Sequence, residues 1–128
     1  MAIALGRVAH FSLAVSDPTA SAEWWLSLFD LEEYKRSASR VVLGNSAIVM
    51  TLVEGTPDPS ALTHMAFRTR DMASLKSARD FLRDNGIALE DPGNEIGPVA
   101  EGSSSLGLWF RDKDGYRWEL YLEAPSEK

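Results

Sequence analysis

The chain has 128 residues, of which 45% are hydrophobic, so it is long and apolar enough for one domain or for two small repeated units. Its net charge of −6 and the lack of a basic run argue against nucleic acid or an anionic membrane as a partner. The absence of cysteine excludes thiolate catalysis, disulfides and cysteine-ligated metals. We expect a cytoplasmic protein, since neither a signal peptide nor a membrane-spanning run is predicted.

The first half of the chain predicts a β-α-β-β-β unit over 6–54. Residues 6–15 are rich in apolar and β-branched residues and predict a buried strand. Asp17 is a candidate helix N-cap, followed by Pro18 and a helix over 19–30 with an apolar face that includes Trp24, Trp25 and Leu28. Three short strands separated by polar or glycine turns follow, at 31–36, 39–44 and 46–55.

After a Gly/Pro-rich linker at 55–61, the same order recurs over 62–123. A strand at 63–70 leads to the candidate cap Asp71 and to a helix that Gly86 ends. The residues that we expect to face inward from this helix are Leu75, Ala78, Phe81 and Leu82. A short strand at 87–91, a loop and a hairpin over 105–123 with an Asp-Gly turn follow. The loop over 93–105 has the length and glycine content of a lid or of a plain connection.

The two halves match each other in detail. His10 and His64 are the only histidines, and each begins the pattern His-x-x-apolar-x-x-x-Asp. Aligning the last strands on Glu54 and Glu123, an offset of 69, sets Met50 over Glu119. Self-similarity of this kind indicates a duplicated unit.

Alternation along strands predicts which side chains share a face. The three groups that should each share a face are His10 with Ser12 and Ala14, His64 with Ala66 and Arg68, and Glu119 with Arg117 and Tyr121. A strand histidine is more often structural than a ligand, but two histidines at matched positions favour a shared role. If the units pair about a pseudo-twofold axis, both imidazoles and the carboxylate would face one cavity. That set suits a divalent ion and leaves positions open for a substrate.

The paired units, the two His-to-Asp strands and the closing RDKDGYRWEL resemble the vicinal oxygen chelate superfamily. This superfamily includes glyoxalase I, bleomycin-resistance proteins, fosfomycin-resistance thiol transferases and extradiol ring-cleaving dioxygenases. The resemblance covers nearly all of the chain, 1–128, as a single domain. It implies an α+β fold in which two βαβββ modules form a curled mixed-sheet cup around a metal, and it implies a homodimer.

Carried over residue by residue, the resemblance implies His10, His64 and Glu119 as metal ligands, with Glu119 also catalytic. Met50 falls at a fourth position and cannot bind a hard divalent ion. The implied metal is Fe²⁺ or Mn²⁺, with Zn²⁺ and Ni²⁺ as alternatives. Further candidates for contact with a small-molecule substrate are Ser12, Met50, Arg68, Trp109, Arg117 and Tyr121.

The three-ligand set narrows the reaction without fixing it. Loss of the fourth carboxylate disfavours glyoxalase isomerisation, and a two-His, one-Glu set resembles that of the extradiol dioxygenases, our first choice. Against that signature, Trp109 and Lys113 stand where the family has Tyr and Pro, and no third histidine is left to act as acid-base. The alternatives are a thiol transferase, a lyase or isomerase of the same superfamily, and a metal-free protein that binds an aromatic drug.

Overall fold

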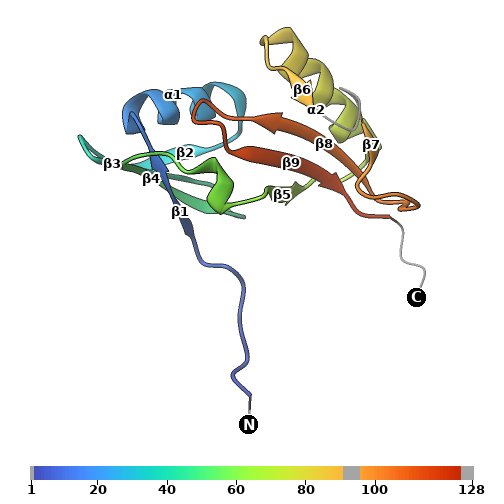
Figure 1. The fold of residues 1–128 in the computed structure, drawn as a ribbon, viewed down its shortest axis with the longest axis horizontal. Helices are drawn as coiled ribbons and strands as arrows, with labels where there is room; N and C mark the ends of the chain where they lie inside the picture. Colours follow the sequence, from blue (N-terminus) through green and yellow to red (C-terminus); the bar gives the residue numbers. More distant parts are fainter. Residues whose placement is uncertain (1, 91–95, 125–128) are drawn as a thin grey trace. The chain divides into compact units, whose positions relative to one another are not determined.

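The computed structural model describes residues 2–90 and 96–124, which form two compact units, Met1–Pro57 (unit 1) and Asp58–Lys128 (unit 2) (Figure 1). The boundary between the units falls inside the predicted linker. Each unit places one main helix against a mixed β-sheet, which confirms the predicted α+β class. In the described part of the chain, no helix is long and apolar enough to cross a membrane.

Unit 1 has the predicted β-α-β-β-β order. Its elements are β1 (Phe11–Val15), α1 (Pro18–Leu28), β2 (Glu32–Ser37), β3 (Arg40–Gly44) and β4 (Val49–Glu54). The strand order is β1-β4-β3-β2, with β1 parallel to β4 and the other pairs antiparallel.

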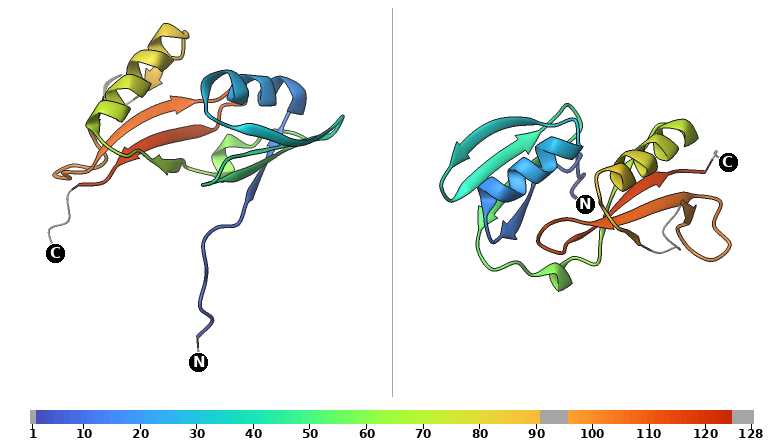
Figure 2. Two further views of the ribbon diagram at one scale, coloured as in Figure 1. Left: turned by 180° about the vertical axis from the view of Figure 1, so that it is seen from behind. Right: turned by 90° about the horizontal axis from the view of Figure 1, so that it is seen from above.

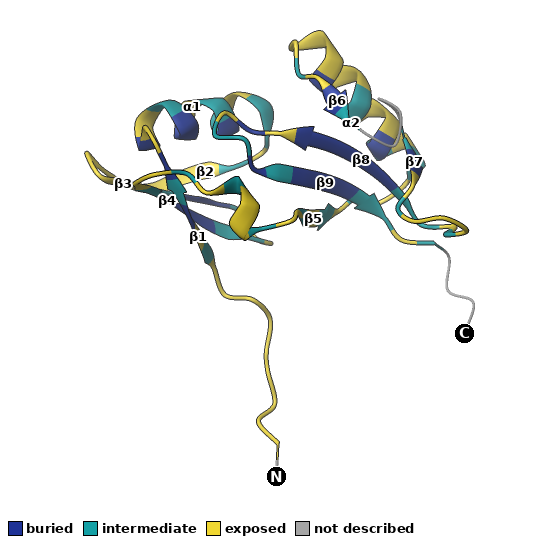
Figure 3. Ribbon diagram, in the orientation of Figure 1, coloured by how far each residue is buried: buried dark blue, intermediate teal, exposed yellow. Residues whose placement is uncertain are grey.

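The first strand is shorter than predicted. It begins at Phe11 rather than at residue 6, and residues 2–10 are exposed and extend away from the sheet (Figures 1 and 3). The register explains the difference, because Phe11 pairs with Met50 and β4 begins only at Val49. Residues before His10 therefore have no β4 residue opposite them.

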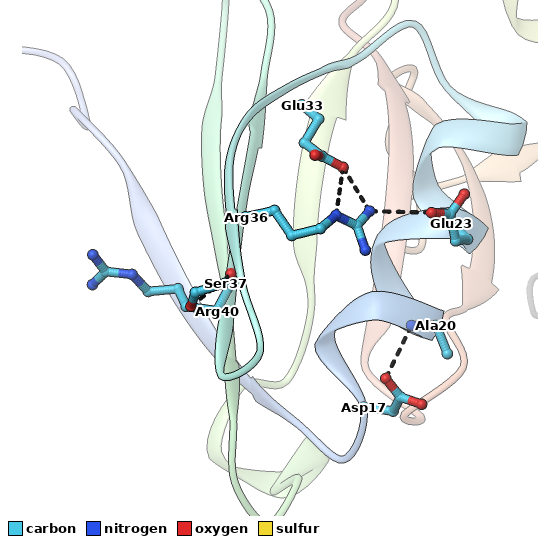
Figure 4. A network of polar contacts seen from close by, with 7 residues as sticks. All are labelled: Asp17, Ala20, Glu23, Glu33, Arg36, Ser37 and Arg40. Carbon is cyan, nitrogen blue, oxygen red and sulfur yellow. Dashed lines mark hydrogen bonds and ion pairs between the residues drawn. The ribbon is translucent and has the colours of Figure 1, made fainter.

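Helix α1 covers one face of its sheet, and local chemistry determines where it begins (Figure 2). The Asp17 carboxylate accepts a hydrogen bond from the Ala20 backbone N–H at 3.1 Å, as predicted for an N-cap. On β2, the Arg36 guanidinium donates to Glu33 and to Glu23 of α1, so it links the strand to the helix (Figure 4). The buried core of unit 1 lies between them and includes Leu13, Val15, Ala22, Trp25, Val41, Leu43, Met50 and Leu52 (Figure 3).

Unit 2 repeats the β-α-β-β-β order, preceded by a short 3-10 turn and with one extra short strand. Its elements are a 3-10 turn η1 (Pro59–Ala61), β5 (Met65–Arg68), α2 (Met72–Asp84), β6 (Leu89–Glu90), β7 (Gly97–Pro98), β8 (Leu106–Arg111) and β9 (Arg117–Leu122). The strand order is β5-β9-β8-β6, and β7 also pairs with β8. Strand β7 lies inside the predicted loop. Residues 91–95, which include the start of the predicted lid, lie outside the described residues.

Helix α2 has the predicted ends but not the whole predicted inner face. Asp71 accepts a hydrogen bond from the Ser74 backbone N–H at 2.8 Å, and Gly86 adopts a positive φ of 76° just beyond the helix. Leu75 and Leu82 are buried, whereas Phe81 is 45% exposed, so its predicted inward position is wrong. At about 100° per residue, Phe81 lies about 120° around the helix from Leu75.

The turn between β8 and β9 is also part of the core. The Asp112 carboxylate accepts hydrogen bonds from the backbone N–H groups of Asp114 and Tyr116 and from the Trp118 indole N–H. The Trp118 ring is fully buried and stacks on Phe67 with a centroid separation of 5.3 Å. Asp112 therefore holds both the turn and a core tryptophan in place.

Candidate functional site

The strand register defines which residues of the two units are equivalent. In unit 2, Ala66 pairs with Glu119 and Glu119 with Trp109; in unit 1, Ser12 pairs with Thr51 and Thr51 with Val42. Paired residues project to the same side of a sheet. Glu119 and Thr51 are therefore equivalent positions of the two units. The last strands are offset by 68 residues, and not by the 69 that the sequence alignment used.

This register corrects the position assigned to Met50. Met50 pairs with Phe11 and Leu43, as Trp118 pairs with Met65 and Phe110. Both Met50 and Trp118 are 0% exposed, and they lie on the helix side of their sheets. The alignment of Met50 with Glu119 is therefore wrong by one residue, and Met50 is a core residue of unit 1.

The side of each sheet that faces away from its own helix is here called the open face. In unit 2 the open face carries Ala66, Arg68, Glu90, Trp109, Arg117, Glu119 and Tyr121. In unit 1 it carries Ser12, Ala14, Lys35, Arg40, Val42, Val49, Thr51 and Val53. The predicted site residues of unit 2 thus share one face, as the alternation of the strands indicates.

Glu119 is a buried carboxylate at the centre of the open face of unit 2. It is 3% exposed, its Oε2 atom has no hydrogen-bond partner, and its Oε1 atom lies 3.5 Å from His64 Nε2. Burial raises the pKa of Glu119 above its ordinary value of 4.5, and the nearby charge of Arg117 opposes this rise. Among the described residues, no hydrogen-bond donor thus compensates the burial of Oε2.

Gly107 makes room for this carboxylate. A Cβ atom at Gly107 would collide with Glu119 Oε2 and would approach Trp109 Nε1 to 3.2 Å. A glycine inside a strand often marks the close approach of another group. The strand is therefore shaped so that the Glu119 carboxylate can lie over it.

His64 lies one residue before β5, with a half-exposed side chain. Its ring meets Trp109 edge-on at a centroid distance of 4.8 Å. The Arg117 guanidinium carbon lies over the Trp109 ring, 4.2 Å from the ring centroid. The Arg117 Nε donates a hydrogen bond to Glu90 at 3.1 Å. Trp109 thus contacts both His64 and the Arg117 cation, which attracts its ring.

A cavity of about 480 Å³ adjoins the side chains of His64 and Glu119. It is lined by His64, Ala66, Arg68, Val99, Trp109, Glu119 and Tyr121. Its volume is in the range of small-molecule sites, about 300–1,000 Å³. Arg68 forms an ion pair with Glu123 at 2.6 Å, and the Tyr121 hydroxyl lies 3.3 Å from Ser105 Oγ. Four predicted substrate contacts of unit 2, namely Arg68, Trp109, Arg117 and Tyr121, therefore lie on or beside one cavity wall.

His10 and Ser12 belong to unit 1. His10 is exposed and lies one residue before β1, which is the place of His64 before β5. Ser12 is exposed on the open face beside Thr51. Within residues 2–90 and 96–124, no three His, Asp or Glu side chains gather into one metal-binding group.

The residues of unit 2 fit a divalent cation. The unpartnered Oε2 atom supplies an acceptor, the glycine leaves it room, and the neutral form of the His64 imidazole supplies a nitrogen donor beside it. Sequence reasoning singled out His64 and Glu119 as candidates but did not point to Gly107, which leaves room for the Glu119 carboxylate. The signal for Gly107 was present, because it interrupts an otherwise apolar strand.

Several solved structures share the fold of this chain. A lactoylglutathione lyase from Agrobacterium tumefaciens is 17% identical, with 92% of this chain and 94% of that chain covered, at a TM-score of 0.73. A fosfomycin resistance protein from Listeria monocytogenes is 16% identical, with 94% and 96% covered, at a TM-score of 0.75. A glyoxylase/bleomycin resistance protein/dioxygenase domain from Frankia sp. EAN1pec is 23% identical, with 94% and 100% covered, at a TM-score of 0.73.

Among curated proteins, none matches this chain significantly. The structural likenesses, all below 25% identity, establish the fold and leave the reaction open. The family model, in contrast, matches residues 7–120, which span both units and include His10, His64 and Glu119. The chain belongs to the glyoxalase/bleomycin resistance protein/dioxygenase superfamily.

Proposed function

We propose that this protein is a divalent-metal-dependent enzyme that acts on a small molecule with vicinal oxygens, and that His10, His64 and Glu119 are the metal ligands. The observation that best supports the proposal is the buried Glu119 carboxylate, with Oε2 unpartnered and Oε1 3.5 Å from His64 Nε2. Burying a carboxylate costs several kcal/mol unless a cation or hydrogen bonds compensate. A divalent ion between the two side chains would provide that compensation.

The ligand types favour particular metals. Two imidazole nitrogens and one carboxylate oxygen suit Fe²⁺ or Mn²⁺, with Zn²⁺ and Ni²⁺ as alternatives. When bound, such an ion polarises the substrate oxygens that it chelates and favours negative charge on them.

The protein's own side chains have separate tasks in this proposal. Glu119 is the catalytic carboxylate of this proposal, and its burial raises its pKa in the metal-free protein. Trp109 and Tyr121 form an aromatic wall of the cavity, which suits an aromatic or other flat substrate. Arg68, which lines the cavity, and Arg117, which lies over Trp109, are the candidates to attract an anionic substituent.

For the reaction, ring-cleaving oxygenation of a catechol-like substrate is the first choice, supported by the three-ligand set of two histidines and one glutamate. Thiol addition and isomerisation are the second choice, and metal-free binding of an aromatic drug is the non-enzymatic alternative. The homodimer and the cytoplasmic location stay predictions.

Metal content is the first test. Protein purified anaerobically without chelators should contain about one metal ion per chain by elemental analysis. His64→Ala and Glu119→Gln should lose it, whereas Glu123→Gln, a carboxylate change on an exposed residue near the end of the same strand, should keep it.

The identity of the metal directs the next assay. Iron leads to oxygen-uptake measurements with catechols, and manganese leads to thiol-transfer assays. If the protein takes up none of Fe²⁺, Mn²⁺, Zn²⁺ and Ni²⁺ after reconstitution, the enzymatic proposal is wrong and a drug-binding role gains support.

A further inference from the structure

We infer that unit 2 has a second binding site, a cleft beside the turn of the β8–β9 hairpin, where Arg111 and Arg117 bind an organic carboxylate with an apolar body. The cleft has a volume of about 840 Å³, within the range of small-molecule sites, about 300–1,000 Å³. Among the described residues, it shares no lining residue with the cavity beside His64 and Glu119. The inference therefore goes beyond the proposed function and does not depend on a bound metal.

Contacts within unit 2 hold the walls of the cleft together. The cleft lies between the chain at and just after η1, strand β6 and the two ends of the hairpin turn. The Tyr116 hydroxyl, in a side chain that is buried in this turn, accepts a hydrogen bond from the Asp58 backbone N–H at 3.1 Å. This bond ties the start of η1 to the hairpin, so the cleft is a built feature of one unit.

Two arginines meet one carboxylate in this cleft. Arg111 Nε donates a hydrogen bond to Glu90 Oε2 at 2.8 Å, and Arg117 Nε donates one to Glu90 Oε1 at 3.1 Å. Both oxygens of Glu90 thus bind a guanidinium group. Because two positive charges meet one negative charge, the cluster keeps a net charge of +1.

Each guanidinium is also held at a second point. Arg111 Nη1 donates to the Gly115 carbonyl oxygen at 2.8 Å, within the hairpin turn. Arg117 lies over the Trp109 ring, as described above. A guanidinium has five N–H donors in a planar fork that matches a carboxylate, so it can bind Glu90 and a ligand together. Since both groups are placed before an anion arrives, binding it orders few side chains.

The charge and the lining of the cleft define the class of ligand. A monocarboxylate would neutralise the net charge of +1, whereas a phosphate monoester with a charge of −2 would leave excess negative charge beside Glu90. The cleft also has an apolar part, formed by the side chains of Pro59, Leu62 and Leu89. It therefore suits a carboxylate attached to a hydrocarbon or aromatic body.

The first test keeps the body of the ligand constant and changes its charge. Binding of benzamide, benzoate and phenyl phosphate to the full-length protein is measured by calorimetry at a pH of about 8, where the phosphate carries a charge of about −2. Benzoate should bind at least about 10-fold more tightly than benzamide, because its bonds to the arginines are charge-assisted. Benzoate that binds no more tightly than benzamide, or less tightly than phenyl phosphate, would overturn the inference.

A change at Glu90 tests the charge balance directly. Glu90→Gln raises the net charge of the cluster from +1 to +2. It should shift the ratio of the two affinities toward phenyl phosphate, relative to benzoate, by about 10-fold. This ratio compares two ligands in one variant, so it is insensitive to a general loosening of the arginines. A ratio equal to that of the wild type would contradict the assigned charge balance.

Further variants locate the bound benzoate. Arg111→Gln should weaken benzoate binding about 10-fold or more, whereas Arg70→Gln, the same change at an exposed arginine outside the cleft, should not. His64→Ala should leave benzoate affinity within about 2-fold of the wild type, because His64 lines the other cavity. Loss of benzoate binding in His64→Ala, or no loss in Arg111→Gln, would overturn the inference and would leave the metal-content test of the proposed function intact.

A variant at an exposed position avoids the risk of misfolding. Thr63 is an exposed residue of the cleft wall, and Thr63→Glu adds a negative charge there. Repulsion should weaken benzoate binding about 5-fold or more. Thr56→Glu, the same change at an exposed threonine outside the cleft, should leave it unchanged. Equal benzoate affinities in these two variants would contradict the inference even if Arg111→Gln does not fold.

Discussion

The two units have the same topology but different open faces. Unit 1 presents small and apolar side chains, two hydroxyls and the cations of Lys35 and Arg40. Unit 2 presents a histidine, arginines, a tryptophan and a buried glutamate. The rows that face the helices differ much less, because both are almost wholly apolar and buried. The helix-facing rows thus determine the fold, and the rows on the open faces determine the chemistry.

The same comparison separates stability from function within single strands. On β9, Trp118 and Leu120 pack in the core. Glu119 lies between them, and the burial of its carboxylate destabilises the folded protein. On β4, Met50 and Leu52 serve the core and Thr51 carries no charge. The buried carboxylate of the two open faces thus lies in unit 2, where the proposed function supplies a reason for it.

The largest effects are expected in the equivalent core positions. Trp118→Ala should destabilise the protein by about 3–5 kcal/mol and Met50→Ala by about 2–5 kcal/mol, because each leaves a cavity in a fully buried row. Phe81→Ala, at a residue that is 45% exposed, should cost much less. Urea denaturation measures all three. A negligible cost for Met50→Ala would place Met50 outside the core and would revive its alignment with Glu119.

The next prediction concerns Gly107, whose missing side chain leaves space for the Glu119 carboxylate. Gly107→Ala should weaken metal binding by about 10-fold to 100-fold, since the new methyl group displaces Glu119 Oε2 from its position. Folding should be little affected, because the atom that must move belongs to the end of a side chain. Gly6→Ala is the matched control, as nothing lies within 4 Å of a Cβ there. Metal affinity equal to the wild type in Gly107→Ala would show that Gly107 does not position the ligand.

A smaller effect concerns the stability of the metal-free protein. Glu119→Gln should raise the free energy of unfolding at neutral pH by about 1–3 kcal/mol, because an amide avoids the cost of a buried charge. Since burial raises the pKa of Glu119, its carboxylate destabilises the fold above that pKa. The advantage of the variant should therefore vanish as the pH falls below the ordinary value of 4.5.

Thr51→Val is the matched change in unit 1. It removes a polar atom from the equivalent position without removing a charge, so its effect on stability should not vary over the same pH range. Chemical denaturation at several pH values measures both variants. A pH-independent gain for Glu119→Gln would mean that the charge of Glu119 is compensated in the folded protein.

Local chemistry made much of the fold predictable. The caps Asp17 and Asp71 and the stop at Gly86 follow from hydrogen bonding and backbone freedom within a few residues, and all three were found where predicted. The length of β1 was not predictable in the same way, because it depends on where its neighbour β4 begins. Strand ends are set by partners that are distant in sequence.

The candidate site was predictable in part. Its histidines stood out by their repeated pattern, but aligning the last strands on Glu54 and Glu123 gave the wrong register, because β4 ends with Glu54 whereas β9 ends one residue before Glu123. The alternation of Met-Thr-Leu at 50–52 and Trp-Glu-Leu at 118–120 carried the correct match. The burial of Glu119 needed the structure, since no sequence pattern shows which polar residue loses its contact with water.

The smallest effects are expected at the helix caps, where the two units are most alike. Asp17→Ala should destabilise the protein by about 1 kcal/mol, because it leaves the Ala20 N–H of α1 without its acceptor. Asp71→Ala should act in the same direction through Ser74. Thermal denaturation measures both changes, and a loss at only one of them would mean that the two helices differ in their dependence on the cap.

The pH dependence refines this last comparison. The hydrogen bond from the Ser74 backbone N–H lowers the pKa of Asp71 below its ordinary value of 3.8. Its stabilisation is therefore complete above 3.8 and is lost as the pH falls through the lowered pKa. Asp71→Asn keeps a side-chain acceptor without a titrating group, so it should retain most of the stability at neutral pH and lose the acid dependence. If Asp71→Asn and Asp71→Ala are equally destabilised at pH 7, the charge of the cap rather than its hydrogen bond supports α2.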